Sequence, residues 1–341
     1  MKAAVYTRYG PPDVVVQIAD VEKPIPKDNE VLIQVRAASV NPLDWHFMRG
    51  TPYFVRIMTG LRKPKITRLG VDVAGQVEAV GGNIMQFKPG DEVFGSCRGA
   101  FAEYACTSES ALVAKPNNVT FEQAASAPVA AFTALQGLRD KGHLQPGQKV
   151  LVNGAAGGVG TFAVQIAKSF GADVTGVCST RNIDMVRSIG AEKTIDYTQQ
   201  NFTTSDQRYD LILECVGNHS FSECRRVLNP TGRFVMVGGP HEMSVISLLA
   251  LMIKPLLLSL FVSQKAVMFI AKSSQDDLTL LGELIATGKL KPVIGGRYSL
   301  SNARDAVRQV EEGHARGKVI ITLDGADETW KDDEPAKRVL A

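Results

Sequence analysis

The spacing of hydrophobic positions changes along the chain and separates two kinds of region. The first region holds short apolar runs at residues 2–6, 31–37, 73–80, 92–94 and 111–114. Sequences rich in Gly, Pro and Asn separate these runs. Closely spaced turns without helical periodicity predict a mostly β unit over residues 1–115.

The middle of the chain alternates apolar strands with helical segments. The predicted strands begin at residue 149 and then cover residues 173–179, 193–195, 209–216 and 233–237. The predicted helices begin near residue 158 and then cover residues 181–190 and 220–228, and residues 121–142 predict a helical crossover from the first region. This alternation predicts a doubly wound parallel sheet, so the fold class is α/β.

The segment KVLVNGAAGGVG joins the first of these strands to its helix. Gly154, Gly157 and Gly160 keep a G-x-x-G-x-x-G spacing, which lets the turn bend tightly and brings backbone N–H groups close to a pyrophosphate. Any tight strand-to-helix turn favours glycine, but the strand before and the helix after this one favour a nicotinamide dinucleotide site. The candidate residues in the turn are Gly154, Ala156, Gly157, Gly158, Val159 and Gly160.

The end of the second strand bears on the choice of cofactor. NAD-specific sites place a carboxylate there, roughly twenty residues past the glycines. Here Ser179 and Arg181 stand at that place, and the first acid is Asp184. Arg181 can pair with a 2'-phosphate, so NADPH is favoured over NADH. The alternative is that Arg181 is only a solvated residue of the first helical turn.

Composition excludes several classes of protein. The 341 residues carry a net charge of +3, with 45% hydrophobic and 21% charged residues, which is ordinary for a globular protein and gives no reason to expect a nucleic-acid partner. The five cysteines have no C-x-x-C spacing and the N-terminus has no signal-peptide pattern, so a reducing, cytoplasmic location is expected. Residues 325–341 are polar and predict a tail.

Six segments together resemble the medium-chain dehydrogenase/reductase superfamily, and more closely its zinc-independent quinone oxidoreductase branch. They are IQVRAASVNPLDW, LGVDVAGQVEAVG, KPGDEVFG, GAFAEYA, VNGAAGGVG and GHARGKVIIT. The resemblance implies a GroES-like, β-rich catalytic domain at residues 1–123 and a Rossmann cofactor domain at residues 124–271. Residues 272–324, which read as helix, strand, helix and strand, would return to complete the catalytic domain.

The chain departs from alcohol-oxidising relatives at the zinc positions. Asn41 stands where they have a cysteine ligand, and Gly70-Val71-Asp72 stands where they have a glycine followed by histidine and glutamate. Zinc prefers thiolate, imidazole and carboxylate, so no catalytic metal is expected. Leu43 also replaces the hydroxyl of their proton relay. The reaction implied is therefore hydride transfer from NADPH to a quinone or an α,β-unsaturated carbonyl, whose own conjugation accepts the charge.

The resemblance also assigns residues. Asn41 is the best candidate for a hydrogen bond to the nicotinamide ribose or the substrate oxygen, although it could be only a turn residue before Pro42. Asn41 and Tyr53 are the candidate catalytic residues, while Asp44 and His46 are expected to be structural. The further candidate cofactor contacts are Thr133, Tyr197, Val216, Gly217, Gly238, Gly239 and Lys318.

Residues 245–262 form a highly apolar segment that Lys254 and Pro255 interrupt. A spanning helix would suffer from both a buried charge and a broken backbone, so a substrate lid or a homodimer surface is favoured over peripheral membrane contact.

Two other functions of the protein stay open: an alcohol dehydrogenase or carbonyl reductase, and an NADPH-binding regulatory protein with little turnover.

Overall fold

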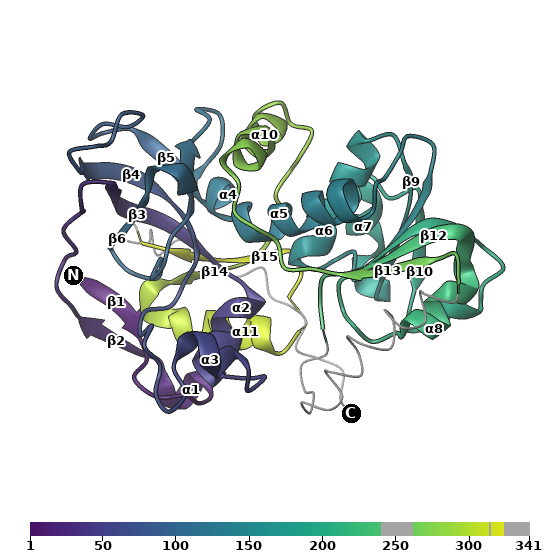
Figure 1. Cartoon of the computed structure of the whole chain (residues 1–341), viewed down its shortest axis with the longest axis horizontal. Helices are drawn as coiled ribbons and strands as arrows, with labels where there is room; N and C mark the ends of the chain where they lie inside the picture. The colour runs from purple at the N-terminus through teal and green to yellow at the C-terminus, as the bar shows by residue number, and fades with distance from the viewer. Residues whose placement is uncertain (240–261, 314, 324–341) are drawn as a thin grey trace.

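The computed structural model describes residues 1–239, 262–313 and 315–323. Two large sheets lie at opposite ends of the long axis, and helices α5 and α6 lie between them (Figure 1). The mixed α/β fold class predicted from the sequence is confirmed. Most of the apolar segment 245–262 falls outside the described residues, and only Val262 is inside them.

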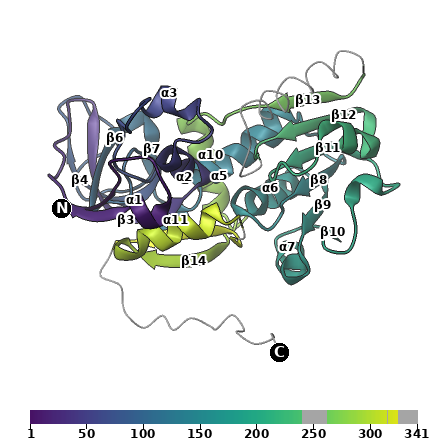
Figure 2. The ribbon, with the colours of Figure 1, turned by 90° about the horizontal axis from the view of Figure 1, so that it is seen from below.

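The middle of the chain forms a six-stranded parallel sheet. Its strands are β8 (Lys149–Asn153), β9 (Asp173–Cys178), β10 (Lys193–Asp196), β11 (Tyr209–Glu214), β12 (Leu228–Met236) and β13 (Lys265–Met268). Their order is β10-β9-β8-β11-β12-β13, and every neighbouring pair is parallel. Figure 2 shows β13 at one edge and β10 at the other. From β8 the chain proceeds outward through β9 to β10, and it then returns to β11 on the other side of β8. Doubly wound sheets bind ligands at such a switch point, here between β8 and β11.

The helices of this unit agree with the prediction in place but differ in detail. They are α6 (Gly158–Ser169), α7 (Ile183–Ser188) and α8 (Phe221–Cys224). The helix predicted over residues 181–190 begins as a 3-10 turn, Thr180–Asn182, and the one predicted over 220–228 continues as another, Arg225–Val227. β12 starts five residues before the predicted strand because Leu228 pairs with Tyr209.

The two ends of the chain share a seven-stranded sheet. Its strands are β3 (Glu30–Val40), β4 (Asp72–Val80), β5 (Glu92–Ser96), β6 (Tyr104–Ser108), β7 (Leu112–Ala114), β14 (Ile294–Ser299) and β15 (Lys318–Thr322). β15 pairs antiparallel with the end of β3, so that Val319 lies opposite Val40. A separate pair joins β1 (Lys2–Val5) to β2 (Gln17–Asp20). This pairing brings Lys318 beside the residues that follow β3.

Helices in the first region were missed by the sequence analysis. They are α1 (Pro12–Val15), α2 (Pro42–Arg49) and α3 (Val55–Thr59). A capping box between Asn41 and Asp44 begins α2, Pro42 occupies its first turn, and Gly50 ends it with φ of +61°. Proline at the first helical position and glycine after the last are helix-end signals, but the eight residues between them are too few to show a helical periodicity.

Three of the remaining helices lie in segments that connect the two sheets, and the fourth lies between β14 and β15. The first three are α4 (Phe121–Ala125), α5 (Pro128–Gln136) and α10 (Gln275–Ala286), and the fourth is α11 (Ala303–Glu311). α5 continues as a π-helical turn, Gly137–Lys141, so the predicted crossover 121–142 is helical for most of its length. One hydrophobic core runs from the parallel sheet through α5 and α6 to Phe94 and Ile320 of the other sheet. Within the described part of the chain, no helix is long and apolar enough to cross a membrane.

Candidate active site

The glycine turn, residues 154–160, leads from β8 into α6. Gly154 has φ of +82°, a conformation that favours glycine, and Gly157 is the N-cap of α6. A Cβ on Gly160 would lie 2.0 Å from the Gly154 carbonyl oxygen, so the turn closes only with glycine there. A Cβ on Gly157 would meet only one atom within 4 Å, at 3.4 Å, which leaves this side of the turn open. The open side faces the first N–H groups of α6, which suits a pyrophosphate.

The turn after β11 is held by a carboxylate that sequence analysis missed. Glu214 is fully buried and accepts hydrogen bonds from Asn153 Nδ2 at 2.8 Å to each oxygen. The backbone N–H groups of Val216 and Gly217 donate to its Oε1 at 2.9 and 2.8 Å. Burial raises the pKa of Glu214, and these donors oppose the rise. Val216 and Gly217 therefore use their N–H groups internally, and only their side chain and carbonyl groups can face a cofactor.

Gly238 and Gly239 follow β12 on the same edge of the sheet. The N–H of Gly238 donates to the Glu214 carbonyl oxygen at 3.2 Å. A Cβ on Gly238 would lie 2.0 Å from the Cys215 carbonyl oxygen, whereas one on Gly239 would meet no atom of residues 1–239, 262–313 or 315–323 within 4 Å. Gly238 is thus required for close packing of two strand ends, and Gly239 is the open position of the pair.

The end of β9 carries the groups predicted to select the cofactor. Arg181 is exposed in the 3-10 turn after Ser179, and Ser179 Oγ accepts from Asn182 Nδ2 at 3.1 Å. Tyr197 is 57% exposed, and its N–H donates to the Cys178 carbonyl oxygen at 3.1 Å. The structure therefore brings Ser179, Arg181 and Tyr197 to neighbouring strand ends.

A carboxylate does lie near this place, but it comes from the next strand. Asp196, opposite Cys178, accepts from Thr180 Oγ1 at 2.5 Å and from the N–H and Oγ1 of Thr198 at 2.9 and 2.7 Å. The Thr180 bond is the main reason that the pKa of Asp196 is lowered. A search along the sequence from the glycines could not find this residue, because strand pairing places it there. Its oxygens are already engaged by Thr180 and Thr198.

Four side chains form a buried polar group, the Asp72 cluster: Ser39, Asn41, Asp72 and Lys318. Each is at most 3% exposed. Asp72 Oδ2 accepts from Ser39 Oγ and from Asn41 Nδ2, both at 2.8 Å, and lies 3.5 Å from Lys318 Nζ. Lys318 Nζ donates to Asn41 Oδ1 at 2.6 Å. Burial lowers the pKa of Lys318, while the nearby Asp72 and Asp44 raise it.

Lys318 also connects this cluster to the glycine turn. The N–H of Gly317 donates to the Ala156 carbonyl oxygen at 2.8 Å, and Gly317 forms an isolated parallel bridge with Gly157. A Cβ on Gly158 would lie 3.2 Å from Lys318 Cδ. The side chain of Lys318 therefore passes the start of α6 on its way to Asn41. This contact joins two regions that lie more than 150 residues apart in the chain.

Helix α5 supplies a further donor to the cluster. The N–H of Val129 donates to Asp72 Oδ1 at 3.0 Å, so the positive end of α5 faces this carboxylate. Thr133 lies one turn further along, half-buried, with its Oγ1 donating to the Val129 carbonyl oxygen at 2.7 Å. The structure thus places Thr133 next to the Asp72 cluster but gives its hydroxyl a partner within the helix.

Asp44 has a structural role beneath Asn41. It is 2% exposed and accepts from the backbone N–H groups of Asn41 at 2.8 Å and Gly70 at 3.2 Å. Burial raises its pKa to about 7, with a smaller contribution from Asp72, although both backbone donors oppose the shift. These bonds hold the start of α2, and with it the Asn41 side chain, against the segment that leads into β4.

Two residues from the same segment lie away from the Asp72 cluster. Tyr53 is 64% exposed before α3, where its ring stacks on the Arg56 guanidinium at 4.4 Å. His46 is in α2, and its Nδ1 lies 2.7 Å from the Thr51 carbonyl oxygen. The hydrogen-bond network described above includes neither residue, so the structure joins Asn41 to Asp72 and Lys318 rather than to Tyr53.

The residues at the positions where alcohol-oxidising relatives bind zinc do not suit this metal. Asn41 Oδ1 already accepts from Lys318, Val71 offers no ligand, and Asp72 is surrounded by donors. An ammonium beside these residues would repel a second cation. Within the described ranges, no three His, Cys, Asp or Glu side chains gather as a metal site. The positive charge at this point belongs to Lys318.

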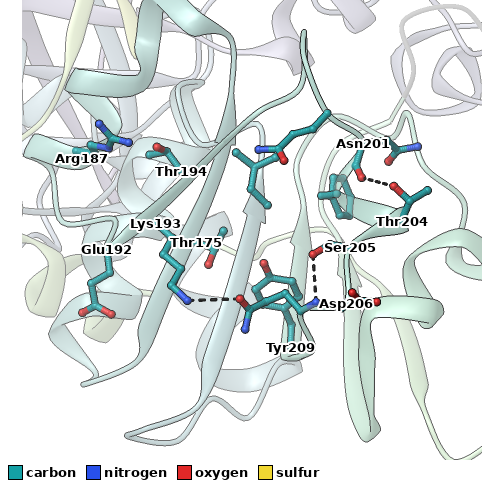
Figure 3. Close-up of a pocket in the computed structure, with 14 residues that line it drawn as sticks. Thr175, Arg187, Glu192, Lys193, Thr194, Asn201, Thr204, Ser205, Asp206 and Tyr209 are labelled. Carbon is teal, nitrogen blue, oxygen red and sulfur yellow. Dashed lines mark hydrogen bonds between the residues drawn. The ribbon is translucent and has the colours of Figure 1, made fainter.

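A cavity of the described residues lies elsewhere (Figure 3). It has a volume of about 640 Å³, and polar groups near the amino ends of β10 and β11 line it, including Lys193 and Tyr209. Ligands of doubly wound sheets bind at the carboxyl ends of the strands, where the glycine turn and the Asp72 cluster lie. We therefore assign no part of the reaction to this cavity.

Comparisons with known proteins agree with this geometry. Residues 27–117 match the alcohol dehydrogenase GroES-like domain family, and residues 189–321 match the zinc-binding dehydrogenase family. A chloroplast envelope quinone oxidoreductase homolog of Arabidopsis thaliana is 34% identical over 94% of this chain and 98% of its own length. An NADPH-dependent alkenal/one oxidoreductase, chloroplastic, of the same plant is 33% identical over 94% of this chain and 79% of its own length. The solved structure of the quinone oxidoreductase from Coxiella burnetii superposes with a TM-score of 0.83, at 30% identity, over 95% of this chain and 99% of that one.

Proposed function

The chain belongs to the zinc-independent quinone oxidoreductase-like branch of the medium-chain dehydrogenase/reductase superfamily, and from this premise we propose that it reduces quinones or α,β-unsaturated carbonyls with NADPH. The observation that carries the proposal is the contact of Lys318 with both the glycine turn and Asn41. This contact puts a cofactor-binding turn directly beside a buried polar cluster that holds an ammonium in place of a metal.

The described residues fit a dinucleotide. The open side of the glycine turn and the start of α6 can hold its pyrophosphate, and the aliphatic part of the Lys318 side chain passes this point on its way to Asn41. Gly239, which has space around it, and the side chain of Val216, which is 42% exposed, lie at neighbouring strand ends. We propose that these groups, with Thr133 and Tyr197, bind the cofactor along the carboxyl edge of the sheet.

The hydrogen bonds of Asn41 decide which of its two expected roles is available. Its Nδ2 donates to Asp72 Oδ2 at 2.8 Å and to the Ser39 carbonyl oxygen at 3.3 Å, which uses both amide hydrogens. Its Oδ1 accepts from Lys318 and keeps one lone pair. Asn41 can therefore accept a hydrogen bond from a ribose hydroxyl but has no hydrogen left for a substrate oxygen. We assign it to the ribose of the nicotinamide.

Bound NADPH supplies a hydride to the acceptor. The acceptor carries the resulting negative charge through its own conjugation, so the protein needs to orient the two partners rather than to stabilise an alkoxide with a metal. Asn41 orients the ribose, and Asp72 and Lys318 fix Asn41. Asp44 accepts from two backbone N–H groups and Lys318 donates to Asn41, so we assign the proton that completes the reduction to solvent.

NADPH rather than NADH is the cofactor that the end of β9 supports. Arg181 is exposed there, and the nearest carboxylate, Asp196, is bonded to Thr180 and Thr198. An arginine side chain can pair with a 2'-phosphate through two hydrogen bonds. The Arabidopsis relative with 33% identity is named NADPH-dependent.

We further propose a homodimer in a reducing, cytoplasmic compartment. Strand β13 is the last in its sheet among the described residues, and Met268 and Ile270 beside it are 41% and 88% exposed. Edge strands of this kind are ready to pair with another chain.

The five cysteines are free thiols, which fits a reducing compartment. We keep the predicted division into residues 1–123, 124–271 and 272–324 as the proposed domains.

The test is NADPH oxidation by chelator-treated protein with a panel of acceptors. The panel holds 1,4-benzoquinone, 9,10-phenanthrenequinone, a 2-alkenal and a simple ketone, with NADH in parallel. Turnover of the quinones or the alkenal, with the ketone unreactive, is expected. Turnover of the ketone alone would favour a carbonyl reductase, and tight NADPH binding without any turnover would favour a regulatory protein.

A further inference from the structure

The segment from Trp45 to Val71 has an unusual charge composition. It contains six Lys or Arg residues and no Asp or Glu. The whole chain has 38 basic and 35 acidic residues, so the remainder holds 32 basic against 35 acidic residues. The remainder of the chain is thus net negative, and this one segment is strongly positive. Arg49 in this segment is paired with Glu311, so its charge is already balanced.

The same segment exposes five large apolar side chains around α3. The exposed fractions are 64% for Tyr53, 48% for Phe54, 75% for Ile57, 73% for Met58 and 71% for Leu61. Arg62, Lys63 and Lys65 follow directly and are exposed. We call these eight residues the α3 patch. The cavity shown in Figure 3 includes none of them.

The backbone beneath the α3 patch is held firmly. Val55 and Thr59 are 7% and 1% exposed and face inward, and Thr59 Oγ1 bonds to the Tyr9 hydroxyl at 2.8 Å. Arg56 stacks on the Tyr9 ring at 4.5 Å and donates to the Gly50 carbonyl oxygen at 3.0 Å. The outward direction of Ile57 and Met58 is therefore fixed by the inward packing of their neighbours, because adjacent positions of a helix point to different sides.

From these observations we propose that the α3 patch binds the surface of an anionic lipid membrane. Exposed aromatic and aliphatic side chains next to a cluster of basic ones form the pattern that inserts between lipid headgroups while the charges meet anionic phosphates. Two copies of the chain would bring the three free cations of each patch together, which disfavours self-association there. The apolar side chains of the α3 patch protrude separately and do not line a cavity. They therefore fit into the deformable interior of a bilayer better than against the rigid surface of a protein partner.

The proposal is tested by co-sedimentation of the full chain with lipid vesicles. Vesicles of phosphatidylcholine alone are compared with vesicles that also contain phosphatidylglycerol, at low and at high salt. The wild-type protein is expected to bind the anionic vesicles, to bind the neutral ones poorly, and to dissociate as salt rises. Equal binding to both kinds of vesicle, or no binding to either, would overturn the proposal.

Two variants of the α3 patch identify the surface. Arg62→Gln/Lys63→Gln/Lys65→Gln should lower the partition coefficient roughly 100-fold, because each basic residue near an anionic surface contributes about fivefold. Ile57→Ser/Met58→Ser should lower it by about tenfold or more, because less apolar area enters the interface. Thermal unfolding of each variant checks that the fold is retained.

Matched variants serve as controls. Lys88→Gln/Lys289→Gln/Arg304→Gln removes three exposed basic residues elsewhere, and Ile25→Ser/Met85→Ser removes two side chains that are 87% and 89% exposed. Both controls should bind anionic vesicles as the wild type does. If the α3 variants also bind like the wild type, the contact lies on another surface and the proposal is wrong. The proposal is likewise wrong if none of the proteins binds vesicles and the α3 variants, but not the controls, change the oligomer size.

Discussion

The glycine turn and the Asp72 cluster lie against each other, yet the protein builds them in opposite ways. The turn is made by seven consecutive residues, and its fit depends on backbone and on the absence of Cβ atoms. The cluster is made by side chains from β3, the N-cap of α2, β4 and β15. Two of its members, Ser39 and Lys318, lie 279 positions apart in the sequence. Local sites of the first kind can be read along a sequence, whereas sites of the second kind exist only after strands have paired.

The largest effect is expected from Asp72→Asn. This change keeps the shape but leaves the buried Lys318 without a carboxylate, and removing one partner of a buried ion pair typically costs about 3–5 kcal/mol. Urea denaturation should show a loss of that size in the free energy of unfolding. Asp206→Asn, at an exposed position, should change it by less than about 0.5 kcal/mol. A loss no greater than that of the control would mean that the cluster does not stabilise the fold.

The glycine turn should respond to a single methyl group. In Gly160→Ala the new Cβ would meet the Gly154 carbonyl oxygen at 2.0 Å, so the turn must move away from its binding geometry. NADPH affinity, measured by fluorescence titration, should fall about 100-fold, equivalent to roughly 3 kcal/mol. Gly82→Ala, where a Cβ meets nothing within 4 Å, should leave affinity unchanged. Normal binding by Gly160→Ala would show that the turn does not hold the cofactor.

Asp44, which holds Asn41 of the Asp72 cluster in place, should make stability depend on pH. Its folded pKa of about 7 lies above the unfolded value near 3.9, so between these values the folded state binds the extra proton and stability falls as pH rises. From pH 5 to pH 7 this group should remove about 2 kcal/mol from the free energy of unfolding. Asp44→Asn should flatten the pH profile by that amount. Parallel profiles for the variant and the wild type would show that Asp44 does not titrate there.

The smallest effect is expected at the far end of the cofactor from the cluster. Arg181→Ser should weaken NADPH about tenfold, equivalent to about 1.4 kcal/mol, and leave NADH almost unchanged, because only NADPH has the 2'-phosphate. Dissociation constants for both cofactors measure this. Arg187→Ser, an exposed arginine on α7, is the matched control. An equal loss for NADPH and NADH would assign Arg181 to another role.

Much of the cofactor unit could be predicted from the sequence because its signals are local. The parallel strands, the glycine turn and the start of α6 follow from apolar runs and glycine spacing within a few dozen residues. Helix α2 was missed because it is only eight residues long, and because Asn41 and Pro42, its N-cap and first residue, form a pair that also starts turns. Only a resemblance to relatives, and no local pattern, had singled out Lys318 and Asn41.

The limits of sequence reasoning are clearest for carboxylates. Asp196 and Glu214 lie within strands, and neither was assigned a role, although one stands beside the end of β9 and the other holds the turn after β11. The position of each follows from strand pairing rather than from a motif. The one available signal was an acidic residue inside an otherwise apolar strand, which must find buried hydrogen-bond donors.

The most direct measurement compares Asn41→Ala with the wild type, both treated with chelator, in NADPH-dependent reduction of 9,10-phenanthrenequinone. The wild type should remain active, and the variant should lose about 10- to 100-fold in kcat, because the ribose is no longer oriented and misplacement in a site of this kind carries a penalty of that size. NADPH affinity, measured on the same samples, should change much less. A chelator-sensitive wild type, or a variant with unchanged kcat, would contradict a metal-free site in which Asn41 connects the Asp72 cluster to the cofactor.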